Sequence, residues 1–235
     1  MDIAIIFSLV VVGAFLQGAT GFGFPFFVTP IAAIIMPELI PGALMVVSIF
    51  ISSDVVFRER HHIVYRETGL ISLGRVVGAA GGAFIVSMLT LTGIKIMVAI
   101  VVLAGVLLSF TGFRPPINIK SLLSVGVISG FFGTSTTIGG PPVAMLYQDK
   151  PGPEVRAVVG SVLWIGAVIS ICWLVVFGLF GIQDIMRAVI YLPAVVMGLV
   201  LSRYGAAYLD KGRMRAAILM ASSAACVVLL INALL

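Results

Sequence analysis

The chain has 235 residues, of which 61% are hydrophobic and only 10% are charged, and its formal net charge is +5. Soluble globular proteins contain about 45–50% apolar and about 25% charged residues, so this composition excludes an ordinary soluble domain. A helix needs about 20 apolar residues to cross the hydrocarbon core of a bilayer. The composition therefore predicts a polytopic membrane protein whose spans occupy nearly the whole chain.

Eight apolar segments follow one another along the chain, separated by short polar stretches such as RERHHIVYRE and FRPPINIK. The apolar runs are continuous and do not alternate with period two, which favours helices over a transmembrane barrel. The predicted fold class is therefore all-α. The segments cover residues 3–36, 39–57, 68–90, 94–112, 121–148, 157–181, 185–202 and 214–235.

The first and fifth segments are too long for one span, and glycine, threonine and proline interrupt each of them. The interruptions read GATGFGFPFFVTP from Gly18 and GFFGTSTTIGGPP from Gly130, and a shift of 112 residues aligns them without a gap. Secondary transporters are commonly built from internal repeats. We therefore expect two membrane repeats, residues 1–112 and 121–235, joined by a loop at 113–120. Each repeat has one broken segment and three spans.

The Lys and Arg residues in the loops indicate how these repeats are oriented. If each broken segment crosses the membrane once, the loops on the two faces carry six and seven basic residues, which is no bias. If each one returns to its own side, loops 58–67, 113–120, 149–156 and 203–215 share a face with eleven basic residues, against two opposite. We therefore predict inverted repeats with the basic face cytoplasmic and both termini outside. Re-entrant hairpins to mid-membrane fit this count, and so do short full-depth crossings.

The two helix breaks are the first candidates for a ligand site. Irregular backbone within a membrane is tolerated where it lines a cavity, and broken helices direct N–H groups and positive dipole ends there. Such helix ends bind anions. The glycines could instead serve close helix packing, with the hydroxyls bonded to their own helices. The break residues that we assign to the substrate are Gln17, Thr20, Gly21, Phe22, Gly23, Thr134, Ser135, Thr136, Thr137 and Gly139.

Arg75 adds a charge within the span 68–90 and is a further substrate-binding candidate. An ionisable residue in a span is by default a functional candidate that faces a cavity or a partner. Arg75 could alternatively snorkel to the interface or pair with Asp54.

Other features of the sequence concern packing and exclude some functions. Gly74, Gly78 and Gly82 lie four residues apart and predict a stripe of close helix contact. No cluster with metal-ligand or catalytic spacing stands out, so we expect no metal, no cofactor and no enzyme activity. We also expect no nucleic-acid partner. The nucleotide-binding pattern G-x-x-x-x-G-K-[ST] is absent from the sequence, which argues against ATP as the energy source within this chain.

The pattern Gly-x-x-Gly-x-Gly-Gly-Gly-x-x-x-x-Pro, placed once near the start of each half, resembles the TauE/SafE sulfite-exporter family. It stands here as GATGFGFPFFVTP and GFFGTSTTIGGPP. The resemblance implies a multi-pass protein of the bacterial inner membrane that transports sulfite or an organosulfonate, and we expect it to work by alternating access.

Several points stay open at this stage. The glycine triplet of the pattern is Gly-Phe-Pro at 23–25 and the second copy is rich in Thr and Ser, so the particular sulfur anion is open. An anion channel with the same dipole-lined constriction is the alternative function. The direction of transport, a coupling proton or sodium ion, and a monomeric or homodimeric state are open too.

Overall fold

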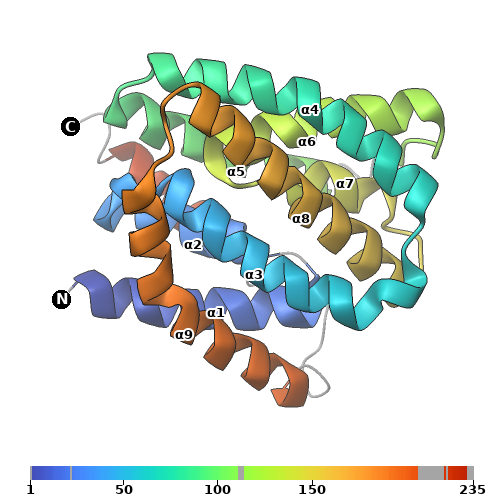
Figure 1. The fold of residues 1–235 in the computed structure, drawn as a ribbon, viewed down its shortest axis with the longest axis horizontal. Coiled ribbons are helices and arrows are strands. Elements are labelled where there is room, and N and C mark those ends of the chain that lie inside the picture. The colour runs from blue at the N-terminus through green and yellow to red at the C-terminus, as the bar shows by residue number, and fades with distance from the viewer. Residues whose placement is uncertain (1, 22, 111–113, 206–219, 221, 232–235) are drawn as a thin grey trace.

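The computed structural model describes residues 2–21, 23–110, 114–205, 220 and 222–231, and the elements of this part of the chain are all helices (Figure 1). The all-α prediction is confirmed. Five helices, α1, α4, α5, α8 and α9, are long and apolar enough to cross a membrane. The elements are α1 (Asp2–Thr20), α2 (Phe24–Ile35), η1 (Pro37–Leu39), α3 (Gly42–Glu59), η2 (Arg60–His62), α4 (Tyr65–Met88), α5 (Leu91–Phe110), α6 (Ile119–Thr136), α7 (Gly140–Leu146), α8 (Gly152–Val176) and α9 (Ile182–Gly205), followed by Ser222–Ile231.

The first long apolar segment forms α1 and α2, and the chain reverses between them at glycine. Gly21 (φ 86°) and Gly23 (φ 136°) hold backbone conformations that favour glycine because it has no Cβ. α1 has 19 residues, which corresponds to a length of about 28 Å. α1 is therefore long and apolar enough to cross a membrane, whereas α2 has only 12 residues.

The second long apolar segment forms α6 and the short helix α7. Thr137 ends α6 in the left-handed region (φ 66°), which is strained for a β-branched residue. Its hydroxyl lies 2.7 Å from that of Thr29, which is in the middle of α2. The second break is therefore buried against the middle of another helix.

The predicted glycine stripe packs α4 against α6. A Cβ added to Gly78 would overlap the carbonyl of Val127, and one on Gly82 would lie 2.7 Å from the Phe131 oxygen. Gly74 meets α6 one turn earlier, so the two helices run parallel, as Figure 1 also shows. The packing role predicted for this stripe is confirmed.

The remaining long helices pack in a related way. α1 lies along α9, where Gly198 leaves no room for a Cβ beside the backbone of Val11 and Phe15. α3 packs against α8, and these two helices lie between the α4–α6 pair and the α1–α9 pair (Figure 1). The first helix of each predicted repeat therefore packs on a helix of the other predicted repeat.

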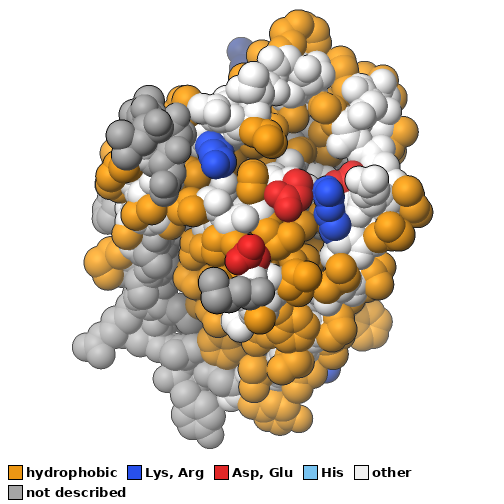
Figure 2. All heavy atoms as spheres, turned by 90° about the vertical axis from the view of Figure 1, so that its left-hand side faces the viewer, with side chains coloured by type: hydrophobic (Ala, Val, Ile, Leu, Met, Phe, Trp, Pro, Cys, Tyr) orange, Lys and Arg blue, Asp and Glu red, His pale blue; other side chains and the backbone are white. Residues whose placement is uncertain are grey.

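Charged side chains gather where loops 58–67, 113–120 and 149–156 meet the last turn of α9, which we call the charged end. Eight described Lys and Arg residues lie here, whereas only Lys95 and Arg187 lie at the opposite end. Figure 2 looks onto that opposite end and shows few charged side chains. Residues 206–215 of the last basic loop lie outside the described residues. Three ion pairs join segments at the charged end: Asp54–Arg203 (2.5 Å), Glu59–Arg156 (2.7 Å) and Arg114–Asp149 (3.0 Å).

Candidate functional site

A small cavity lies inside the helix bundle, between the flank of the first break and the second break. Its volume of about 10 Å³ is close to the least that can hold one water molecule. It brings together three of the residues predicted from the sequence, namely Gln17, Arg75 and Thr137. The lining residues are Gln17, Pro25, Met45, Ser48, Ser52, Arg75, Gly133, Thr137, Leu163 and Ala167.

Arg75 is the charged residue of this cavity, and its side chain is only 2% exposed. Snorkelling to the interface is therefore wrong for Arg75. Pairing with Asp54 is also wrong, because that carboxylate lies at the charged end beside Arg58 (3.5 Å) and Arg203 (2.5 Å). Among the described residues, no carboxylate pairs with Arg75. A buried charge without a counter-charge costs several kcal/mol of stability, so a role for this arginine has to offset that cost.

The guanidinium of Arg75 is held against the second break. Nη1 donates a hydrogen bond to the Ser129 hydroxyl (2.7 Å), which donates in turn to the Gly139 carbonyl (2.5 Å). A Cβ on Gly133 would lie 2.7 Å from Nη2, and one on Gly139 would lie 2.9 Å from Nη1. Nε has no hydrogen-bond partner among the described residues. The planar fork is thus fixed on one side while part of its donor capacity remains unused.

Neutral polar groups face the cavity from α1 and α3. Gln17 is 1% exposed, and its amide nitrogen lies 3.3 Å from the Ser52 hydroxyl. The amide oxygen of Gln17 and the hydroxyl of Ser48 have no hydrogen-bond partner among the described residues. Buried polar groups without partners cost free energy, and together with Arg75 they form a polar surface that a small polar ligand can satisfy.

The other hydroxyls of the second break are used within the protein. Thr134 lies 2.7 Å from the Ser170 hydroxyl of α8. Ser135 and Thr136 donate to carbonyls one turn earlier in α6, at 2.7 and 2.8 Å. These three residues lie outside the cavity lining, and the bonds of Ser135 and Thr136 are those of the packing alternative.

The residues of the first break lie near the charged end. Thr20 donates to the Leu16 carbonyl at 2.8 Å, and a Cβ on Gly21 would lie 2.6 Å from Cγ of Arg156. Gly23 is the residue before α2, and Phe22 lies outside the described residues. The first break therefore contributes to the cavity through its flanks, Gln17 and Pro25, and not through Thr20 or Gly21.

Several cavity residues were not identified in the sequence. Ser48 and Ser52 lie one helical turn apart in α3, and this spacing in an apolar span is a signal that could have marked a polar face. Ser129 does not line the cavity but holds Arg75. It lies one turn before Gly133 of the second break, and nothing in the sequence links it to Arg75.

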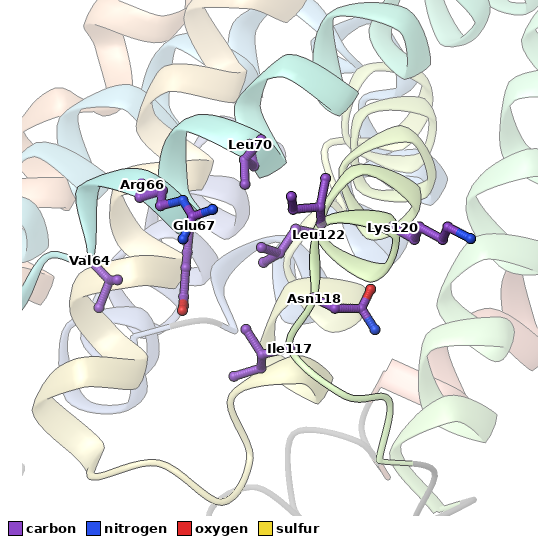
Figure 3. Close-up of a pocket in the computed structure, with 9 residues that line it drawn as sticks. Val64, Arg66, Glu67, Leu70, Ile117, Asn118, Lys120 and Leu122 are labelled. Atoms are coloured by element: carbon purple, nitrogen blue, oxygen red, sulfur yellow. The ribbon is translucent and has the colours of Figure 1, made fainter.

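A larger, open hollow of about 810 Å³ lies at the charged end, between the first turns of α4 and α6 (Figure 3). Figure 3 shows Lys120 pointing away from Arg66 and Glu67. Glu67 accepts a hydrogen bond from Tyr147, beyond the end of α7. Burial, together with this hydrogen bond, raises the pKa of Tyr147, so the hydroxyl stays a donor. Because these polar groups do not converge, the central cavity is the stronger candidate.

The long apolar helices around a small buried polar cavity place this chain in the class of multi-pass membrane proteins. Residues 5–229 match the family described as "Sulfite exporter TauE/SafE", and the chain therefore belongs to this transporter family. The resemblance predicted from the helix breaks is confirmed. No curated protein and no solved structure matches the chain.

Proposed function

We propose that the chain is a secondary transporter that moves a small sulfur-containing anion, sulfite or an organosulfonate, across the bacterial inner membrane by alternating access. The observation that carries this proposal is Arg75, a buried charge without an acidic partner among the described residues. We infer that the central cavity, which here has room for about one water molecule, widens to admit an anion, and that the anion then supplies the missing counter-charge. The sulfite-exporter family match supports the class of substrate.

The donor set around the cavity fits an oxyanion. A guanidinium presents N–H groups in a planar fork that binds two oxygens of one anion at once. We assign further donors to Gln17, Ser48 and Thr137, which line the same cavity. The substrate is then held between the flank of the first break and the second break. Gly133 and Gly139 leave the guanidinium room beside the second break.

The proposal includes two inverted repeats, residues 1–112 and 121–235. The packing of α1 on α9 and of α4 on α6 supports it, because each pair joins the first helix of one repeat to the third long helix of the other. Inverted repeats allow one arrangement to open to either side in turn. The excess of basic residues at the charged end supports a cytoplasmic position for that end.

Uptake of sulfite and of sulfoacetate by vesicles that contain the purified protein tests the function. We expect saturable uptake of these anions and weaker uptake of malonate, the carboxylate analogue of sulfoacetate. Arg75→Met should abolish uptake because it removes the charge, whereas Arg75→Lys should retain part of it because it removes only the fork. Undiminished uptake by a folded Arg75→Met protein contradicts the proposal. Single-channel currents in a planar bilayer would identify the alternative, an anion channel.

A further inference from the structure

Gly166 of α8 lies directly against the guanidinium of Arg75. A Cβ added to Gly166 would overlap Nε, Cζ and Nη2 of Arg75, at separations below the 3.0 Å that Cβ atoms keep in proteins. Leu163, one turn before Gly166, and Ala167, the next residue after it, line the central cavity. α8 therefore forms a wall of the cavity and lies against one face of the guanidinium.

The guanidinium cannot move freely away from this wall. On its other side, Gly133 and Gly139 leave room for hydrogen atoms only, since a Cβ on either one would lie less than 3.0 Å from a guanidinium nitrogen. Ser129 fixes Nη1 by a hydrogen bond of 2.7 Å. The guanidinium thus occupies a slot formed by three glycines, which come from α6, the second break and α8.

We propose that Gly166 is a positioning residue of the anion site, because only a bare helix surface at this point lets the fork of Arg75 lie in the slot beside the cavity. This inference rests on the proposed function. A methyl group at position 166 displaces the guanidinium, so the anion loses its bidentate partner although the charge is still present. The side chain at position 166 then controls the affinity without itself touching the substrate.

A double-mutant cycle in the full-length protein tests this role. The affinity for sulfite is measured by calorimetry for wild type, Gly166→Ala, Arg75→Lys and the double variant. We expect Gly166→Ala to weaken binding at least tenfold in the wild-type background. In the Arg75→Lys background the same change should cause no further loss, because the ammonium of lysine has no planar group to displace.

Gly160→Ala is the matched control in the same helix. A Cβ on Gly160 would lie 2.9 Å from the Val55 side chain of α3, so this variant disturbs the packing of α8 without touching Arg75. We expect it to lower the melting temperature but to leave the sulfite affinity within twofold of wild type. An equal loss of affinity in both variants would show a general packing effect and overturn the inference.

Two further outcomes contradict the role of Gly166. Wild-type affinity in Gly166→Ala is one, and an equal loss in the arginine and lysine backgrounds is the other. Failure of wild type to bind either sulfite or sulfoacetate refutes the proposed function instead. The same cycle, measured as melting temperatures without ligand, then decides whether Gly166 positions Arg75: independent effects of the two substitutions refute it.

Discussion

Four consecutive residues at the end of α6 carry hydroxyl groups, and their surroundings give them different roles. Thr134 joins α6 to α8 through Ser170, and Ser135 and Thr136 bond to their own helix. Only Thr137 lines the cavity. A helix rotates by about 100° per residue, so neighbouring side chains with the same chemistry face different elements.

This difference predicts unequal effects of removing neighbouring hydroxyls. Thr137→Val should weaken sulfite binding by about 10- to 100-fold, because a hydrogen bond to a charged group contributes roughly 1.5–3 kcal/mol. Thr136→Val should change the affinity less than twofold, because its hydroxyl is bonded to Phe132. Titration calorimetry on both variants measures the difference.

Thr29→Val is the control for the first of these variants. It removes the hydroxyl pair of 2.7 Å between Thr29 and Thr137 but leaves the Thr137 hydroxyl in the cavity. If Thr29→Val weakens binding as much as Thr137→Val does, the pair stabilises the second break and Thr137 does not bind the anion.

At the residue scale, the sequence identifies the candidate site residues better than it predicts their contacts. Arg75 is recognisable because arginine is costly inside an apolar span. Its hydrogen-bond partner Ser129 and its neighbour Gly166 belong to other helices, and no periodicity within one span indicates which helices meet. For the same reason, the sequence could not show that Thr134, Ser135 and Thr136 bond within the protein. Their hydroxyl groups suit ligand binding and internal hydrogen bonds equally well.

At the scale of helices, glycine sets how closely the two helices of a pair approach each other. The stripe of α4 allows its backbone to approach the carbonyls of α6, and close approach increases the van der Waals contact that holds helices together in lipid. The spacing of four residues was enough to predict this stripe. The position of each break along the bundle was not predictable, because it depends on the length of α1 and on the contact of Thr137 with α2.

Two glycines of α4 with different surroundings test the packing of the stripe. Gly78→Ala should lower the melting temperature strongly, because the added Cβ overlaps the backbone of Val127 and overpacking costs about 1–3 kcal/mol. Gly81→Ala should be neutral or stabilising. Its Cβ would lie 3.6 Å from the Phe131 ring, and alanine favours a helix by about 1 kcal/mol over glycine. Similar melting temperatures for the two variants would contradict the parallel packing of α4 on α6.

The ion pair Glu59–Arg156 joins α3 to α8 at the charged end. Both side chains are largely buried, with 14% and 18% exposure, and two nitrogens of Arg156 lie 2.7 Å from the same carboxylate oxygen. Glu59→Arg or Arg156→Glu alone should lower the melting temperature, because each places two like charges side by side. The double variant, Glu59→Arg with Arg156→Glu, should recover most of the lost melting temperature.

The pair Lys150–Glu154 is the matched comparison for this prediction. It is more exposed and does not link helices, since it joins Glu154 in the first turn of α8 to Lys150, two residues before that helix (3.4 Å). Such i,i+4 pairs contribute about 0.3–0.5 kcal/mol, so Lys150→Gln should shift the melting temperature only slightly. Additive effects of the two reversals at 59 and 156 would show that this ion pair does not join the helices.

At the scale of the whole molecule, the two ends of the bundle differ in charge, and this difference predicts its orientation in the membrane. Basic loops remain on the cytoplasmic side, so the charged end should face the cytoplasm. The sequence was sufficient to group these loops, because counting Lys and Arg does not require knowledge of the packing. It could not reveal that α1 pairs with α9.

Cysteine labelling in intact cells measures this orientation. After Cys172 and Cys226 are replaced by serine, single cysteines at His61 and Lys150 should resist a membrane-impermeant reagent. A single cysteine at Lys95 should react, because this residue is partly exposed at the opposite end. Reaction at His61 from outside would reverse the proposed orientation.

The pairing of α1 with α9 has a consequence for how the protein is made. α1 leaves the ribosome long before α9, which is complete only when synthesis has reached Gly205. α4 and α6 can pair much earlier, since only α5 separates them in the chain. Until α9 arrives, the surface of α1 around Gly18 remains open to lipid or to the translocation machinery. A ribosome that stalls before α9 therefore leaves α1 without its main neighbour, and membrane proteases can recognise the incomplete chain there.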